Sequence, residues 1–535
     1  MFRSAAVRIA FAALAGIACT VGGTASAQGR PLVYCAASDP EGFDMARWVA
    51  TQTIDAAGMA LYNRLVEFEA GTLKLVPGLA ERWEASTDGR AYTFHLRRGV
   101  KFHTTEWFTP TRDLNADDVL LSFERYRDRE SPFNKAYGVS SYPYNNGWAA
   151  NVVSIEKLDP MSVRITLKAA DSTFIANVAM VTSHIISAEY AEGLQQRGKL
   201  AELDTRPIGT GPWVMRRYDK DVQVRYDAHP AYWGGRAKSD RLVIQTVKDS
   251  AVRVQKLKAG ECHVAPYPPP AEIASLKADT NLAVMEQEGL NVGYLAYNTL
   301  MAPFDKVEVR KALNMAINKE AILDAVFQGA GKAAKNPIPP TMWSYNNDTV
   351  DDPYDPEAAR KMLADAGVTG LKMKIWAMPV QRPYNPDARK MAELIQADFA
   401  KVGVEAEIVS YEWGEYLERS KAKDRDGALL LGWTGDNGDP DNFLAVLLGC
   451  SAVGGSNRAQ WCHQPFEDLI QKAKILPTNE ARTPVYMEAQ KVFKEQAPWA
   501  TIAHSVVFMP MSTKVMNYKM DPLGSHRFDG VDIAE

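Results

Sequence analysis

The strongest constraint on the fold of this 535-residue chain is an alternation of strand and helix patterns between residues 371 and 432. Short apolar runs predict strands, and longer stretches with apolar residues every three or four positions predict helices. The expected elements are a strand at 371–376, a helix that starts at Asn385-Pro386 with proline in its first position and stops at Gly403, a strand at 404–410, a helix at 413–420 and a strand at 427–432. This βαβαβ order predicts an α/β fold with a mostly parallel sheet and right-handed crossovers.

The last of these strands runs into a loop, residues 432–441, with the sequence GWTGDNGDPD. In open α/β sheets, ligands bind in the crevice outside the carboxyl ends of the strands, which is where Asp436 is expected. Gly432 and Gly435 would let a ligand approach the backbone, and Trp433 would supply an apolar wall. The same residues also suit a simple turn, and the run alone does not decide between the two interpretations.

A second loop, residues 377–384, leaves the carboxyl end of another predicted strand and carries Arg382. An arginine and an aspartate at the ends of strands in one sheet form a charge pair that suits a zwitterion. The alternative is that Arg382 and Asp436 pair with each other or with solvent.

The N-terminus has the pattern of a removable export signal. Arg3 and Arg8 precede an apolar stretch at 9–21, and residues 25–27 form a small-residue cleavage site, so we expect a signal peptide at 1–27. The apolar stretch is too short to span a bilayer. Cys19 raises a lipoprotein alternative, which is disfavoured because Gly16 stands where a lipid-attachment motif has leucine.

Charge and composition narrow the class of protein. Removal of the signal changes the net charge from −4 to −6, which argues against nucleic acid as a partner. With 46% hydrophobic and 24% charged residues, the chain is an ordinary globular protein, long enough for two or three lobes.

Four cysteines remain once Cys19 is removed, an even number that favours two disulfides in an exported protein. Sequence alone allows three pairings. The short spacing favours Cys450 with Cys462, which would leave Cys35 to reach Cys262. Metal binding is the competing interpretation, but the chain has no CxxC motif and no histidines at ligand spacing.

The first half of the chain is predicted to be rich in β-strands. One hairpin is expected around the turn at Asp88-Gly89 and another around Asp159-Pro160. Between them, Asn115 is the predicted N-cap of a helix whose first turn holds Asp117 and Asp118.

Several motifs resemble the periplasmic dipeptide-binding proteins of bacterial ABC importers, and the likeness covers nearly all of the mature chain. The motifs of this branch are WAMPVQRPYNP at 376–386, YEWGEY at 411–416 and GWTGDNGDPDNF at 432–443. Further matches are LYNRLVEF at 61–68, LNADDV at 114–119, PIGTGP at 207–212 and GLNVGY at 289–294. LNADDV and PIGTGP mark the wider peptide, nickel and opine solute-binding family.

The resemblance implies a role for each site residue. Asp436 would bind the α-ammonium of a dipeptide, and Arg382 its α-carboxylate. Side-chain pockets would be lined by Trp413, Trp433 and Tyr384, with Thr434 and backbone groups near Gly435 at the peptide bond. Tyr142 would add a wall from the smaller lobe. The family's disulfides correspond to Cys35 with Cys262 and Cys450 with Cys462, and the chain departs from the family pattern at 48–53 and 136–148.

The resemblance also implies a two-lobed fold with an extra β-rich subdomain and a hinge between the lobes. Lobe I would comprise 28–62, 208–289 and 508–535, subdomain II 63–207, and lobe III 290–507. The expected protein is a periplasmic monomer without cofactor that delivers dipeptides to the membrane permease of an ABC importer. The surface sequence leaves open whether it also signals to a chemoreceptor.

Elementary chemistry agrees with this interpretation. Two extended residues span only about 7 Å, so charges fixed at both ends measure the length of a ligand. The planar fork of Arg382 can bond both oxygens of a carboxylate.

An enzyme is the main alternative, but no nucleophile elbow, zinc-protease motif or phosphate loop is present. Calcium is disfavoured because Gly438 and Pro440 stand where an EF-type loop needs oxygen ligands. Other solutes of the same fold, among them oligopeptides, nickel complexes and haem, remain alternatives.

Overall fold

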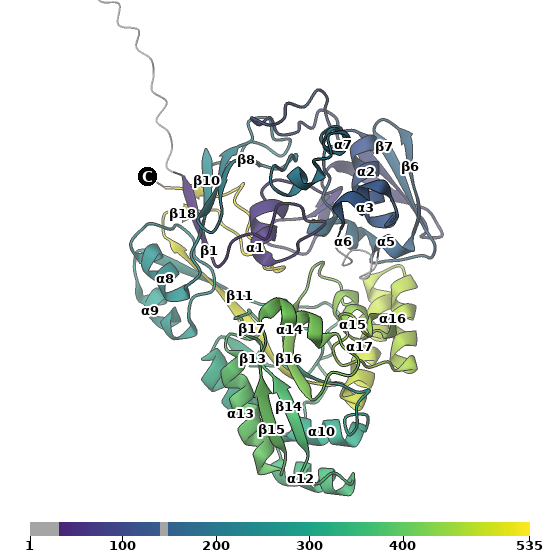
Figure 1. The fold of residues 1–535 in the computed structure, drawn as a ribbon, viewed down its shortest axis with the longest axis vertical. Coiled ribbons are helices and arrows are strands. Elements are labelled where there is room, and N and C mark those ends of the chain that lie inside the picture. Colours follow the sequence, from purple (N-terminus) through teal and green to yellow (C-terminus); the bar gives the residue numbers. More distant parts are fainter. Residues whose placement is uncertain (1–30, 140–147, 535) are drawn as a thin grey trace, which may run out of the picture.

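The computed structural model describes residues 31–139 and 148–534 and contains two bodies, one above the other in Figure 1. We call them the upper body, formed mainly by residues 31–246 and the end of the chain, and the lower body, formed mainly by residues 291–505. Two long paired strands, β11 (Leu282–Glu288) and β17 (Trp499–Ser512), lie where the two bodies join.

The upper body contains two four-stranded sheets that share one hydrophobic core. The first has the order β1 (Leu32–Ala36), β10 (Arg241–Thr246), β9 (Gln223–Ala228) and β8 (Trp213–Asp219). The second has the order β4 (Ala80–Ala85), β5 (Ala91–Leu96), β7 (Ser162–Leu167) and β6 (Val152–Asp159). Both predicted hairpins are confirmed, since β4 pairs with β5 and β6 with β7 in antiparallel fashion.

The remaining elements connect and cover these sheets. Short strand pairs are β2 (Val66–Phe68) with β3 (Leu75–Pro77), and β18 (Val515–Met516) with β19 (Asp532–Ile533). The helices before the lower body are α1 (Thr51–Thr53, continued by a π-helical turn at Ile54–Gly58), α2 (Ala116–Arg127), α3 (Pro132–Tyr137), α5 (Trp148–Asn151), α6 (Phe174–Val178), α7 (Ala188–Gln196), α8 (Ser250–Lys258) and α9 (Ile273–Ala278). Asn115 caps α2 as predicted, and Asp118 completes a capping box.

The lower body is built on a mixed sheet. Its order is β11, β17, β12 (Asn291–Tyr297), β16 (Ala428–Thr434), β14 (Lys372–Trp376) and β15 (Glu405–Val409), with β13 (Gly331–Ala333) on β17. The predicted βαβαβ unit is present, and β14 pairs in parallel with both β15 and β16. The prediction of a mostly parallel sheet is wrong, because β16 pairs antiparallel with β12, and β12 and β11 pair antiparallel with β17.

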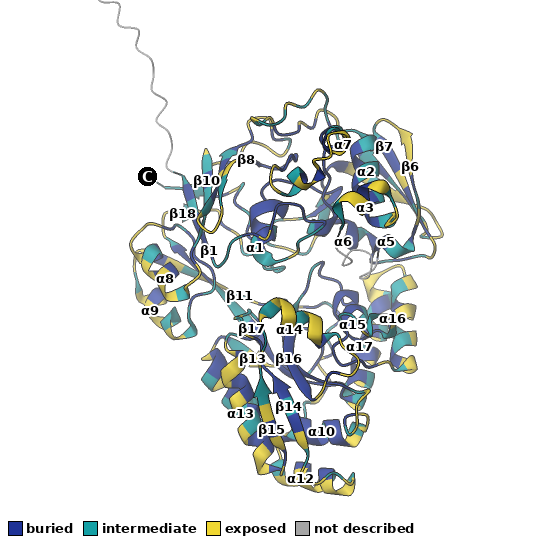
Figure 2. Cartoon of the chain, in the orientation of Figure 1, coloured by how far each residue is buried: buried dark blue, intermediate teal, exposed yellow. Residues whose placement is uncertain are grey.

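Helices cover both faces of this sheet. They are α10 (Val307–Ala316), α11 (Lys319–Ile322), α12 (Pro356–Asp365), α13 (Ala388–Lys401), α14 (Trp413–Ser420), α15 (Asp441–Leu448), α16 (Gln464–Ile475) and α17 (Asn479–Gln496). Along β16, Leu429 and Leu431 pack in a core with α14–α17, while Ala428 and Leu430 pack in a core with α10–α13. Successive side chains of a strand point to opposite faces, so burial on both faces requires the continuous apolar run of this strand. Figure 2 shows the result as buried central strands under partly exposed helices.

Helix α13 begins later than predicted. Asp387, rather than Asn385, is its N-cap, and its side chain accepts a hydrogen bond from the backbone N–H of Lys390 at 2.9 Å. Asn385 is instead engaged in a tight turn, where its backbone N–H and C=O both bond Arg382 at 3.0 Å. Pro386 therefore precedes the helix.

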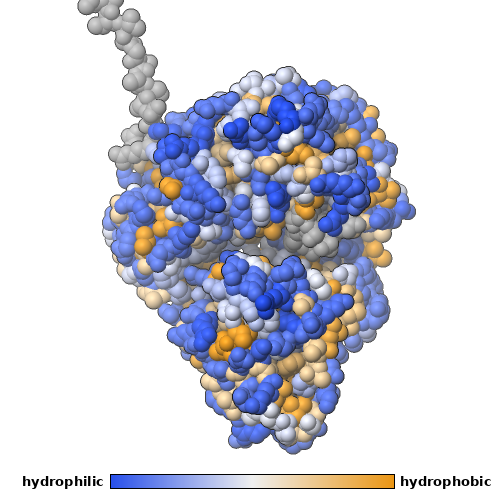
Figure 3. Space-filling view, in the orientation of Figure 1, coloured by the Kyte–Doolittle hydropathy of each residue, from blue (hydrophilic) through white to orange (hydrophobic). Residues whose placement is uncertain are grey.

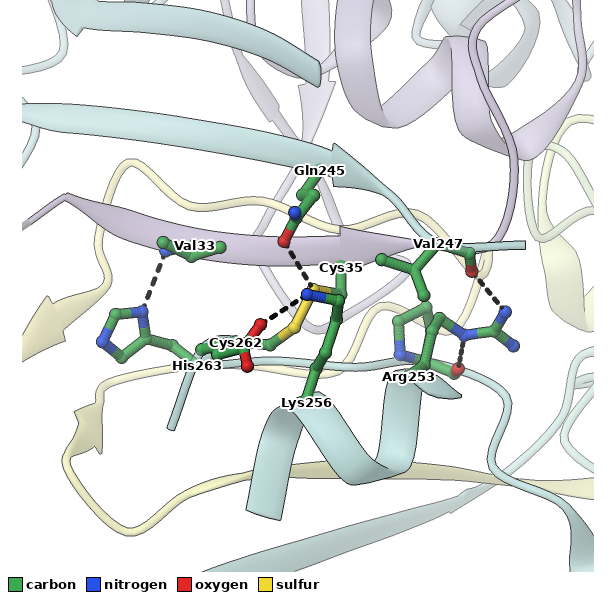
Figure 4. The surroundings of a disulfide bond; sticks show 10 residues. Val33, Cys35, Gln245, Val247, Arg253, Lys256, Cys262 and His263 are labelled. Carbon is green, nitrogen blue, oxygen red and sulfur yellow. Dashed lines mark hydrogen bonds and ion pairs between the residues drawn. A yellow bond between two sulfur atoms is a disulfide. The ribbon is translucent and has the colours of Figure 1, made fainter. Parts of the chain in front are cut away.

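Both predicted disulfides are present in the structure. Cys35 in β1 is bonded to Cys262, which follows α8, and Cys450 is bonded to Cys462. Figure 4 shows the first bond between β1 and α8, close to Arg253. The buried Arg253 side chain donates to four backbone carbonyls on either side of α8, so the segments before and after this helix are held together. The four acceptors are Val247, Lys248, Pro266 and Tyr267.

The aromatic ring of Tyr384 packs on the central strands and so connects them to the loop that carries Arg382. Gly293 of β12 and Gly432 of β16 are directly paired, and a Cβ on either would overlap Tyr384. The buried Tyr384 ring therefore lies directly on the sheet and holds the loop at the carboxyl end of β14. Gly432 serves this packing, because the space its side chain would need is filled by Tyr384 rather than left open for a ligand.

We expect Gly432→Ala to reduce the free energy of unfolding by about 1–3 kcal/mol, because the new methyl group must displace the ring of Tyr384. Urea denaturation followed by far-UV circular dichroism would measure the change. Gly193→Ala is the matched control: this glycine lies within α7, and the new methyl group would meet the flexible end of Arg197 at ordinary contact distances of 3.8 and 3.9 Å. The control should be neutral or stabilising by up to about 1 kcal/mol. Equal stability of Gly432→Ala and the parent protein would contradict the packing of the Tyr384 ring on Gly432.

Candidate ligand-binding site

The Arg382 side chain stands at the rim of the lower body. The turn at 382–385 presents it, and Tyr384 anchors that turn from below. Its guanidinium lies 4.7 Å from the ring centre of Trp413, the first residue of α14, in a cation–π contact. Burial raises the pKa of Tyr384 to about 12, although the nearby Arg382 charge opposes the shift. Arg382, Tyr384 and Trp413, three of the predicted site residues, are thus brought together.

A large cavity opens beside Arg382. Its volume is about 490 Å³, and both bodies line it. The upper body contributes Glu41 and Thr51, the segment after α8 contributes Tyr267, and the lower body contributes Arg382 and Trp413. Burial raises the pKa of Glu41, while the positive charge of Arg382 across the cavity acts in the opposite direction. The space-filling view shows a furrow between the two bodies in this face of the molecule (Figure 3).

Asp436 lies just beyond the end of β16, and a neighbouring asparagine holds it. The side-chain oxygen of Asn442 accepts hydrogen bonds from the backbone N–H of Asp436 and from the indole N–H of Trp433, both at 2.9 Å. The side-chain amide of Asn442 donates to Oδ2 of Asp436 at 3.2 Å. Trp433 and Asp436 are therefore connected through one side chain.

The rest of this loop is a turn fastened by buried polar contacts. Asp439 receives two hydrogen bonds from Arg482 of α17, each 2.7 Å long. Burial acts to lower the pKa of Arg482, yet the pKa is raised because the paired carboxylate favours the charged form. Asn437 donates to the side chain of Asn177 in the upper body at 2.6 Å. The simple-turn interpretation is thus correct for residues 437–441, while Asp436 lines a cavity.

The two predicted charges lie on separate cavities. Asp436 borders a cavity of about 50 Å³ with Arg64 and Thr182 of the upper body. A third cavity, of about 30 Å³, is lined by Pro383 and Thr434, one from each loop. Among the residues that the structure describes, no ion pair joins Arg382 to Asp436. Each of the two charged residues thus lines a cavity to which both bodies contribute.

Two other predicted site positions have different outcomes. Gly435 is buried, and a Cβ there would lie 2.8 Å from Leu290 and from Phe443, so its missing side chain is explained by packing. Tyr142 falls outside the described residues.

Sequence reasoning missed Asn442, Arg482 and Glu41. Asn442 lies in the first turn of a helix, Arg482 far along the chain in α17, and Glu41 in the other body. Only Asn442 had a sequence signal, because a polar residue inside the apolar α15 calls for an explanation.

Within the described ranges, no group of three or more His, Cys, Asp and Glu side chains is arranged to hold a metal ion. No helix in that part of the chain is long and apolar enough to cross a membrane.

Comparison with known proteins finds relatives that match nearly the whole chain. The dipeptide-binding protein of Escherichia coli (strain K12) is 50% identical over 95% of this chain and 96% of its own. Haem-binding protein A of Haemophilus influenzae is 47% identical over 95% of this chain and 93% of its own. The crystal structure of a dipeptide-binding protein from Pseudoalteromonas sp. SM9913 with Met-Leu is 38% identical, covers 94% of this chain and 100% of its own, and has a TM-score of 0.87.

The model of the bacterial extracellular solute-binding proteins, family 5, matches residues 74–455. The two-lobed α/β architecture, the paired loops at the carboxyl ends of β14 and β16, and the relatives at about half identity lead to one conclusion: the chain belongs to the family 5 extracellular solute-binding proteins.

Proposed function

We propose that this protein captures dipeptides in the periplasm by binding both termini and delivers them to an ABC importer. The observation that carries the proposal is the pair of fixed, oppositely charged side chains, Arg382 and Asp436, on adjacent loops of one sheet. The similarity to dipeptide-binding proteins along the whole chain supports it. In this proposal the protein binds and releases its ligand without chemical change.

Each charge suits one terminus of a dipeptide. Arg382 would receive the carboxylate, because its planar fork bonds both oxygens and its face rests on Trp413. Asp436 would receive the ammonium, with Trp433 and Thr434 beside it. A longer ligand would leave one charge unpaired in a partly desolvated cleft, which costs several kcal/mol. The cavity beside Arg382 supplies room for varied side chains.

We further propose that lobe I (28–62, 208–289, 508–535), subdomain II (63–207) and lobe III (290–507) move about the paired strands β11 and β17. This pair joins the two bodies, and the limit at 507/508 falls within β17. A signal peptide at 1–27 and two disulfides support export to an oxidising compartment. We also propose that the protein works as a monomer beside its membrane permease.

A peptide is favoured over haem, which is the ligand named for the Haemophilus influenzae relative. The two charges have opposite signs and line separate cavities between the bodies, which suits a zwitterion. A family fold does not itself choose between such ligands.

Asp436→Ala should weaken dipeptide binding by about 2–5 kcal/mol, because the ligand's ammonium would be left without its partner. Isothermal titration calorimetry with a dipeptide measures the change, and thermal unfolding should show an intact fold. Asp424→Ala, an exposed aspartate in the same body, is the control and should bind normally. An unchanged affinity in Asp436→Ala would exclude the proposed role.

C-terminally amidated dipeptides should bind at least about 30-fold more weakly than the free acids, because the amide cannot form the paired charged hydrogen bonds with Arg382. In Arg382→Ala the two ligands should bind almost equally, since the discriminating group is gone. Tryptophan fluorescence titrations of both proteins with both ligands give the four affinities. Equal discrimination by parent and variant would assign carboxylate recognition elsewhere.

A further inference from the structure

We propose that Asn442 is a positioning residue for ligand recognition, which orients the Asp436 carboxylate toward the ligand's ammonium and ties it to Trp433. The proposal rests on the proposed function. It names the residue that orients Asp436, one of the two charged side chains that would bind the ligand's termini. Asn442 itself does not line the cavity that Asp436 borders.

The chemistry of its neighbours fixes the orientation of the Asn442 side chain. Its Oδ1 faces two donors, the indole N–H of Trp433 and the backbone N–H of Asp436, both at 2.9 Å. Its Nδ2 faces an acceptor, the Asp436 carboxylate, at 3.2 Å. Exchanging the oxygen and nitrogen would break all three hydrogen bonds, so only one amide orientation is stable.

The backbone and neighbours that hold Asn442 are themselves firmly fixed. The residue is 4% exposed and lies in the first turn of α15, where its backbone N–H bonds the carbonyl of Asp439 at 3.0 Å. Asp439 is held in turn by both hydrogen bonds from Arg482 and accepts the backbone N–H of Asp441 at 2.9 Å. Because these neighbours fix the Asn442 side chain, its hydrogen bond holds the Asp436 carboxylate in one orientation.

A neutral amide has an advantage over a cation in this place. A lysine or arginine beside Asp436 would orient the carboxylate but would also compete with the ligand's ammonium for its charge. The amide of Asn442 donates one hydrogen bond to Asp436 and brings no positive charge of its own. The same amide side chain accepts the indole N–H of Trp433, so one residue fixes both the aromatic ring and the carboxylate.

A second buried asparagine provides a matched control. Asn314 in α10 also bridges an aromatic donor and a carboxylate: it accepts from the Tyr297 hydroxyl at 2.9 Å and donates to Asp352 at 3.2 Å. It lines none of the three cavities described above. Asn442→Ala and Asn314→Ala therefore remove the same kind of bridge, one beside the site and one away from it.

The experiment compares a dipeptide with its des-amino analogue, in which hydrogen replaces the ammonium, by calorimetry on the full mature protein. Loss of the ammonium should weaken binding by at least ~30-fold in the parent and in Asn314→Ala. In Asn442→Ala the ratio of the affinities for the dipeptide and its des-amino analogue should fall to less than ~10-fold, because an Asp436 carboxylate without a fixed orientation distinguishes the two ligands poorly. An Asn442→Ala ratio equal to that of the parent would overturn the proposal, since general damage weakens both ligands alike. A parent ratio near one would instead refute the proposed function itself.

A second variant keeps the test decisive if Asn442→Ala fails to fold. Asn442→Asp retains the acceptor for Trp433 but replaces the donated hydrogen bond with a second carboxylate beside Asp436. Two adjacent carboxylates share a proton, and the ligand's ammonium would displace it, so affinity should rise with pH from about 5 to about 7. The parent protein should show a flat profile in that range. A flat profile for Asn442→Asp would also overturn the proposal.

Discussion

The parallel pairing of β14 with β16 is the constraint on which the site depends. Parallel neighbours run toward the same edge of a sheet, so the loops that follow these two strands lie on the same side of it, although β16 continues to Thr434, past its pairing with the end of β14. The pairing is fixed because β16 is buried on both faces, and a slip by one residue would exchange the side chains of its two cores. A uniformly apolar strand thus fixes the placement of two polar loops.

The two charged side chains are mounted in different ways. Arg382 is held through packing: the ring of Tyr384 lies on Gly432, its backbone carbonyl lies on Gly293, and the guanidinium of Arg382 lies on Trp413. Asp436 is held through hydrogen bonds with Asn442, and the turn before the helix of Asn442 is fixed by the buried ion pair of Asp439 with Arg482. The difference follows from charge and size, because a long arginine can lie along an aromatic surface while a short carboxylate needs donors close by.

The sequence predicted local features well and non-local ones poorly. The bounds of α14, the capping of α2 and the hairpins follow from side chains within a few residues of each other. The mixed sheet was not predictable in this way, because its antiparallel half pairs β12 with a strand some two hundred residues later. The start of α13 moved because a turn and a helix compete for the same residues, and the side chain of Asp387 decided the outcome.

The candidate site shows the same division. Strand periodicity singled out Arg382 and Asp436 at the edge of the sheet, and the motif resemblance assigned a role to each, but neither source indicated what holds them. Gly432 and Gly435 illustrate the reason. A glycine beside a candidate ligand site is equally compatible with a ligand and with a neighbouring side chain, and only the packing of Tyr384, Leu290 and Phe443 decides between them. The supporting residues of a site are set by tertiary contacts, so the structure adds most where the sequence motif ends.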